Sequence, residues 1–119
     1  MCNPELDQLP SIDDECFAEL RDVMGDDFAD LIHDFLSDVP VQLDLLQTAI
    51  DREDADQLYH AAHKFKSSCG SIGAPRLAEL IRRLELAGRQ KTLGSSAELL
   101  AQARAVAAET MAGLHERLG

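Results

Sequence analysis

Hydrophobic residues recur at intervals of three and four along most of the chain, a spacing typical of one buried face of an α-helix. The pattern predicts helices over about residues 11–24, 26–50, 55–72, 75–88 and 95–118. No stretch of useful length alternates with the period of two that indicates a half-buried strand. Short links join the four longer segments, which favours antiparallel neighbours. We therefore expect an all-α protein, an antiparallel up-down four-helix bundle with a short additional N-terminal helix.

Proline and glycine refine the expected boundaries. A polar lead over residues 1–10 precedes one domain over residues 11–119, a length that suits a single core. Pro40 lacks a backbone N–H, which predicts a bend or a break in its helix near residues 37–39. Gly88 is expected to end the fourth helix.

Charge is divided unevenly along the chain, whose formal net charge is −11. Residues 1–56 hold 17 acidic and two basic side chains, whereas residues 57–119 hold nine basic and five acidic ones. Such an acidic chain argues against nucleic acid as a partner, since phosphate-backbone binding needs a basic surface. The sequence has neither a membrane-spanning run nor the order of a secretory signal, so we expect no membrane partner and a cytoplasmic location. The basic half is either a solvated face or a docking surface for an acidic partner.

The three cysteines, Cys2, Cys16 and Cys69, are odd in number and widely spaced. This arrangement fits neither a disulfide framework nor a four-ligand zinc site. None is part of a CxxC pair, and Cys2 and Cys16 lie among acidic residues that disfavour a reactive thiolate. We interpret all three as reduced thiols rather than as redox sensors.

The candidate chemistry lies in YHAAHKFKSSCGSIG, residues 59–73. At about 100° per residue, His63 falls on the side of its helix away from the apolar seam, so its imidazole should face solvent. Lys66, Ser67 and Gly70 follow three, four and seven residues later and share nearly the same face. A surface histidine is therefore bordered by one cation and two very small residues.

These residue types suit phosphoryl exchange. A neutral imidazole is a competent nucleophile near neutral pH and needs no strong base to activate it. Lys66 can offset the charge of phosphoryl oxygens, and Lys64 adds a weaker field from the neighbouring face. Ser67 and Gly70 have small side chains, so another protein can approach the helix closely at these positions. Such an approach would explain Gly70, since glycine inside a helix costs about 1 kcal/mol relative to alanine. Spacing alone leaves open that His63 is an ordinary surface residue.

The stretch HKFKSSCGSIGAPRLAELIRRLE resembles the signature of histidine phosphotransfer domains, H-x-x-K-G followed by two small residues, an aliphatic residue and a closing glycine. His63 matches the phosphoacceptor of that family, and Lys66 matches its lysine. The other matching positions are Phe65, Ser68, Cys69, Ile72, Gly73, Leu84 and Glu85. The upstream run LIHDFLSDVPVQLDLLQTAID resembles the family's preceding helix, so the likeness spans about residues 15–118.

The resemblance implies a phosphorelay intermediate that is not an enzyme and has no ATP site. His63 would accept a phosphoryl group from an aspartyl phosphate in the receiver domain of a hybrid sensor kinase. It would then pass this group to the receiver aspartate of a response regulator. The receiver domains would supply Mg²⁺ and most of the catalysis, so we expect no cofactor and no metal in this chain, and a monomer. The cognate partners stay open, as does whether the chain is free-standing or part of a hybrid kinase.

Ser67 is a departure that matters, because the family usually has glycine directly after the lysine. Its side chain would stand beside the phosphoryl group, where it either donates a hydrogen bond or crowds the receiver. We expect slower or more selective transfer rather than its loss.

Two alternatives compete with the relay. His60 lies three residues before His63 and could hold a metal ion with it, but no acidic residue on that face supplies a third ligand. We therefore expect His60 to border the docking surface, together with Lys64, Ser67 and Gly70. The second alternative is a helical adaptor that binds receiver domains without transferring phosphate, against which an intact His63 and Lys66 argue.

Overall fold

The computed structural model of the chain describes residue 6 and residues 8–118, and every regular element within them is helical. A short helix, α2, precedes four long ones. Their bounds are α2 (Asp14–Met24), α3 (Phe28–Asp51), α4 (Ala55–Ile72), α5 (Pro75–Gln90) and α6 (Ser96–Leu118). One turn of 3-10 helix precedes α3 and another precedes α6, namely η1 (Gly25–Asp27) and η2 (Leu93–Ser95). Residues 1–5 and 7 of the expected polar lead lie outside the described residues.

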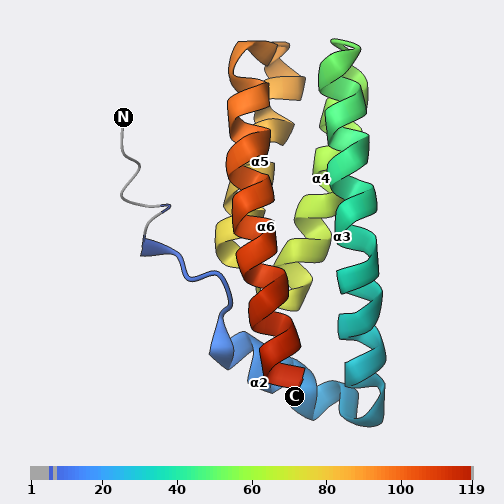
Figure 1. Cartoon of the computed structure of the whole chain (residues 1–119), viewed down its shortest axis with the longest axis vertical. Helices are drawn as coiled ribbons and strands as arrows, with labels where there is room; N and C mark the ends of the chain where they lie inside the picture. The colour runs from blue at the N-terminus through green and yellow to red at the C-terminus, as the bar shows by residue number, and fades with distance from the viewer. Residues whose placement is uncertain (1–5, 7, 119) are drawn as a thin grey trace.

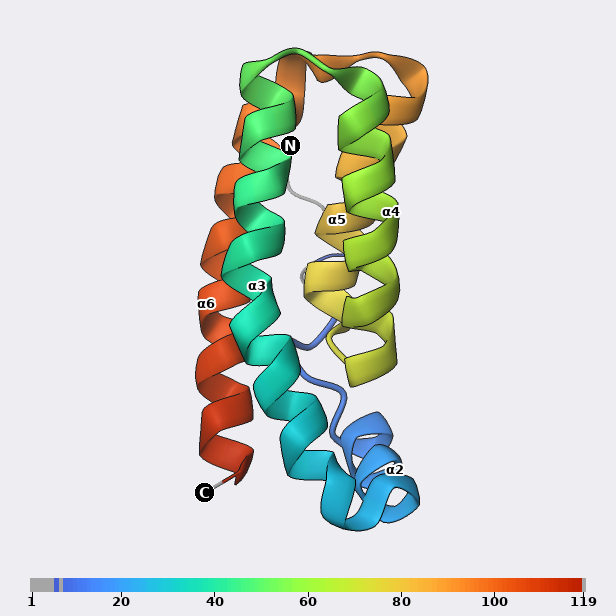
Figure 2. The ribbon, with the colours of Figure 1, turned by 90° about the vertical axis from the view of Figure 1, so that its right-hand side faces the viewer.

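Neighbouring long helices run in opposite directions, as the colour gradient shows (Figure 1). Contacts join α3 to α4, α4 to α5, α5 to α6 and α6 back to α3, so the four long helices enclose one core. The short helix α2 lies across the end of the bundle where the chain terminates (Figure 2). The sequence prediction of an antiparallel up-down bundle with an additional N-terminal helix is confirmed.

The core consists mainly of aliphatic side chains from the inner faces of the long helices. Ile32 of α3, Leu58 and Phe65 of α4, Leu84 of α5 and Leu100 of α6 are each at most 1% exposed. Burial of such side chains contributes about 1.5–3 kcal/mol each relative to exposure. Because Phe65 is buried, the face of α4 that carries His63, two residues earlier, is turned toward solvent.

Pro40 bends its helix but does not break it, so of the two predicted outcomes the bend is the one that occurs. The helix α3 is continuous from Phe28 to Asp51, and Figure 2 shows its axis bending near the middle of its length. Pro40 is exposed, whereas Val39 and Leu43 on either side of it are buried. Packing of both halves against the core therefore holds the helix together across the missing backbone hydrogen bond.

Gly88 does not end α5, so the sequence prediction for it is wrong. The helix continues to Gln90, and Lys91 then takes the left-handed conformation at φ 57°. Gly88 instead lies where α5 approaches α4 closely. A methyl carbon placed on it would lie 2.7 Å from the backbone nitrogen of Tyr59 and 2.8 Å from the carbonyl oxygen of Ala55. The missing side chain lets α5 pack backbone to backbone on α4.

The described cysteines are free thiols, as the sequence predicted for them. Burial raises the pKa of the Cys69 thiol to about 12, which keeps it protonated and unreactive in the core. Cys2 lies outside the described residues. No helix in the described part of the chain combines the length and the apolarity needed to cross a lipid bilayer.

Gly70 of α4 and Gly88 of α5 provide a matched test of this packing. Gly88→Ala should lower the free energy of unfolding by about 1–3 kcal/mol, because the added carbon meets backbone atoms of α4 that cannot move aside. Gly70→Ala should raise it by up to about 1 kcal/mol, since alanine favours the helix and its methyl group meets no atom within 4 Å. Urea denaturation of the three proteins measures both effects. Equal stability of the two variants would contradict this account of α4 and α5.

Candidate functional site

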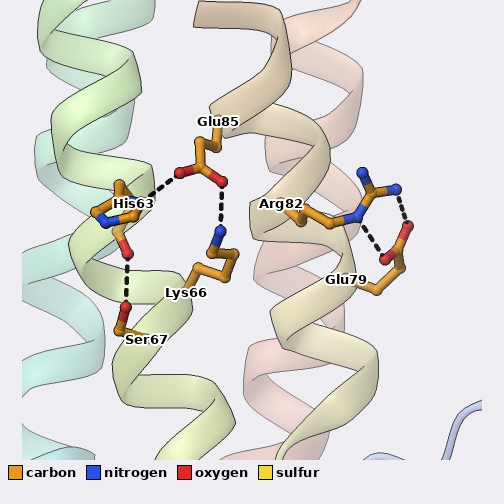
Figure 3. A network of polar contacts seen from close by, with 6 residues as sticks. All are labelled: His63, Lys66, Ser67, Glu79, Arg82 and Glu85. Atoms are coloured by element: carbon orange, nitrogen blue, oxygen red, sulfur yellow. Dashed lines mark hydrogen bonds and ion pairs between the residues drawn. The ribbon is translucent and has the colours of Figure 1, made fainter. Parts of the chain in front are cut away.

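Glu85 of α5 joins the two residues that the sequence singled out on α4. The carboxylate oxygen Oε2 lies 2.5 Å from Nδ1 of His63, and Oε1 accepts a hydrogen bond from Nζ of Lys66 at 2.6 Å (Figure 3). The Glu85 side chain is only 12% exposed, whereas the His63 side chain is 57% exposed. A largely buried carboxylate therefore holds a solvent-accessible imidazole in place.

This contact determines which imidazole nitrogen is available to a partner. An ionised carboxylate only accepts hydrogen bonds, so Nδ1 of His63 must carry the hydrogen. In the neutral ring the lone pair then lies on Nε2. Nε2 is therefore the ring nitrogen that carries a free lone pair in the neutral form.

Opposing influences act on the carboxyl group of Glu85. Burial raises its pKa, but hydrogen bonds from Lys66 and His63, together with their charges, lower it by more. The net result is a pKa below the ordinary value of 4.5. Glu85 is thus ionised near neutral pH, as the proton on Nδ1 of His63 requires.

Basic and aromatic side chains surround this group on the α5 side. A shallow pocket of about 310 Å³ contains His63 in its wall. Its lining residues are Tyr59, His63, Lys66, Arg82, Glu85, Leu86 and Arg89. Arg82 also binds both carboxylate oxygens of Glu79, at 2.8 and 2.7 Å (Figure 3). Basic residues of the second half of the chain therefore gather beside the histidine.

The remaining residues singled out by sequence lie around His63 on α4. Ser67 donates its hydroxyl to the backbone carbonyl of His63 at 3.2 Å, so the hydroxyl is engaged with the helix (Figure 3). Gly70 and Lys64 are exposed, and the space above Gly70 is open. His60 is exposed and packs edge-on against the ring of Tyr59, with centroids 5.1 Å apart.

A second depression lies on the other side of α4, between α2, α3 and α4. It has a volume of about 580 Å³ and reaches Ser67, Ser68 and Ser71 on α4. Apolar side chains and two aspartates make up the rest of its wall, namely Leu20, Leu31, Phe35, Ile72, Asp34 and Asp38. Ser67 therefore connects the surroundings of His63 with a mainly apolar groove.

Sequence reasoning missed the contribution of α5 to the site. Glu85 matches a family position, but the sequence predicts no role for it, and no sequence pattern points to Tyr59 or Arg89. The antiparallel register explains their placement, because Glu85 and Arg89 are one turn apart on α5, opposite His63 and Tyr59 on α4. Among the described residues, no group of three or more His, Cys, Asp or Glu side chains is arranged to hold a metal ion.

The fold and the site together define a class, a helical bundle with an exposed histidine that a carboxylate of the neighbouring helix holds. Comparisons with known proteins specify it further. The family model named Hpt domain matches residues 30–117. Among solved structures, the chain is similar to histidine-containing phosphotransfer protein B (HptB) from Pseudomonas aeruginosa PAO1, with 30% identity and a TM-score of 0.88. That alignment covers 91% of this chain and 94% of HptB.

A comparison with curated proteins finds no match. Because the family model covers most of the chain, the chain belongs to the Hpt domain family. Its function is accordingly that of a carrier in histidine phosphotransfer, within a phosphorelay.

The charge of Glu85 predicts a pH dependence. Because its pKa is lower in the folded chain than the ordinary value, its ionised form stabilises the fold above about pH 4.5. This stabilisation is lost as the pH falls through the lowered folded-state pKa. A ¹³C NMR titration should place the Glu85 midpoint below 4.5, and Lys66→Met should raise it, since one hydrogen bond is lost while burial remains. Lys64→Met, on the neighbouring face, is the control and should leave the midpoint nearly unchanged.

Proposed function

We propose that His63 accepts a phosphoryl group from an aspartyl phosphate in the receiver domain of a hybrid sensor kinase. It then passes the group to the receiver aspartate of a response regulator. The observation that carries the proposal is the contact of Glu85 with Nδ1 of His63, which leaves the lone pair of Nε2 directed away from the carboxylate. Family membership supports phosphotransfer in general, and this geometry supports His63 as the residue that performs it.

Each transfer exchanges one bond for another. Nε2 of His63 attacks the phosphorus atom, the bond between phosphorus and the aspartyl oxygen breaks, and the electron pair of that bond stays on the receiver carboxylate. The proton on Nδ1 remains hydrogen-bonded to Glu85, which offsets the positive charge that develops on the imidazole. In the second transfer a receiver carboxylate attacks phosphorus, and the pair returns to Nε2. The receiver domains supply Mg²⁺ for both steps.

Lys66 is suited to follow the phosphoryl group. Its Nζ is held by Glu85 in the unphosphorylated chain, and its side chain is 31% exposed. An ammonium group has three donors on a flexible stem, so Lys66 can keep a contact with Glu85 and offer another donor to a phosphoryl oxygen. The added negative charge on His63 would thereby be shared between the lysine and the partner.

The exposed residues around His63 form the surface that we assign to the receiver domains. Gly70 and Ser67 leave the ridge of α4 low on one side of His63, while His60 and Lys64 border it on the helix. The apolar groove that begins at Ser67 continues this surface toward α2 and α3. A helical adaptor without transfer would need this surface but would not need an oriented imidazole, so the contact with Glu85 favours the relay.

Labelling of His63 tests the proposal. His63→Gln should abolish ³²P transfer from a phosphorylated cognate receiver and leave the helical circular dichroism spectrum unchanged, because His63 is exposed and lies outside the core. His115→Gln is the matched control, since it changes an exposed histidine on α6, outside the surface assigned to the receivers, and should keep full labelling. A panel of receiver domains, each tested as donor and as acceptor, would identify the partners and the direction. Label retained on His63→Gln would refute the assignment.

The effect of Ser67 on transfer is a separate prediction. Ser67 is exposed one turn after His63, with its hydroxyl bound to the backbone carbonyl of His63, and it adds bulk where the family usually has glycine. Ser67→Gly should therefore speed transfer to at least one receiver by a few-fold, or widen the range of receivers that are served. Rapid-quench measurements with the same receiver compare the two proteins. Identical rates for every receiver would remove a role for Ser67.

A further inference from the structure

The imidazole of His63 has a second neighbour besides Glu85. The ring of Tyr59, one turn earlier on α4, lies nearly parallel to it, with an interplanar angle of 18° and centroids 5.9 Å apart. This is an offset stacking arrangement within the range of favourable aromatic contacts. A hydrogen bond at Nδ1 fixes one edge of the imidazole, and a stacked ring restrains its plane.

Tyr59 is in turn held from α5. The guanidinium carbon of Arg89 lies 5.9 Å from the centroid of the Tyr59 ring, within the reach of a cation–π interaction. Arg89 follows Gly88, the residue at which α5 packs directly on the backbone of Tyr59. Tyr59 is also partly buried, in contrast to His63. The aromatic ring that restrains the imidazole is therefore anchored by two features of the neighbouring helix.

The register of α4 and α5 places two residues of one helix opposite two residues of the other. Tyr59 and His63 are four residues apart on α4, and Glu85 and Arg89 are four residues apart on α5. Because the helices are antiparallel, Glu85 meets His63 and Arg89 meets Tyr59. All four side chains line the same pocket.

We propose that Tyr59, anchored by Arg89, is a positioning residue that restrains the imidazole plane of His63 for phosphoryl transfer. The inference rests on the proposed function for its kinetic part, while the order of the imidazole can be measured without any phosphate. Reactive groups held in advance near the attack geometry lose less freedom on reaching it. Tyr59 itself exchanges no proton and forms no bond in the reaction.

Two substitutions separate the aromatic ring from its hydroxyl group. Tyr59→Leu keeps a side chain of helix-favouring, apolar character but removes the stacking face, and Tyr59→Phe keeps that face. In the free protein, three-bond couplings of the His63 side chain should show a single rotamer for the native chain and for Tyr59→Phe. They should show averaging for Tyr59→Leu. Transfer from a phosphorylated receiver should be about tenfold slower for Tyr59→Leu and near native for Tyr59→Phe.

Arg89 supplies the matched second test. Arg89→Gln should loosen the His63 rotamer and slow transfer in the same direction as Tyr59→Leu, by a smaller factor. Arg104→Gln, which alters an arginine on α6 near Asp44, should change neither quantity. Circular dichroism spectra establish that each variant is folded.

Three results would overturn the proposal. The first is a His63 rotamer that stays ordered in Tyr59→Leu, even if transfer slows, because Tyr59 would then act through contact with the receiver. The second is a failure of Tyr59→Phe to restore the native couplings. The third is an unchanged transfer rate in a Tyr59→Leu protein whose imidazole has become mobile. A failure of the proposed function is distinct from all three, since it would appear as label retained on His63→Gln.

Discussion

The backbone of α5 passes so close to that of α4 that a methyl carbon at Gly88 would overlap atoms of Tyr59 and Ala55. The polar groups of the site depend on this approach. A carboxylate reaches only about three bonds from its backbone, so Glu85 can bind both His63 and Lys66 only where the two helices are near each other. The aliphatic core enforces the same geometry, because Phe65 and Leu84 are buried beside these residues. Close packing of α4 and α5 thus determines which nitrogen of the exposed His63 is hydrogen-bonded.

The single carboxylate of Glu85 serves two partners, and this sharing shapes the electrostatics of the site. In the resting chain it holds a proton on Nδ1 and keeps Lys66 close to His63. A phosphoryl group on Nε2 would bring negative charge to the other side of the ring, where Lys66 can turn toward it. The bulk of the chain is acidic, yet the wall of the pocket beside His63 carries Lys66, Arg82 and Arg89. A local excess of basic groups therefore lies where an acidic receiver site would approach.

Much of the fold was predictable from the sequence, because a repeating apolar pattern reports directly on which helix faces are buried. The same reasoning placed His63, Lys66, Ser67 and Gly70 on one exposed face, since residues on one helix are related by its pitch alone. Contacts between helices could not be predicted in this way. The roles of Glu85, Tyr59 and Arg89 depend on the register of α5 against α4, which no local pattern encodes. The prediction that Gly88 ends its helix fails for the same reason, because one sequence does not distinguish a glycine that ends a helix from one that lets two helices pack closely.

Gly70 and Gly88 differ in what their missing side chains make room for. The space above Gly70 is open, whereas the space beside Gly88 is filled by α4 of the same chain. A population of variants selected only for folding would keep larger residues at Gly70 and discard them at Gly88. Selection for signalling would discard larger residues at both Gly70 and Gly88. The positions that separate the two selections would outline the partner's footprint on this bundle without a structure of the complex.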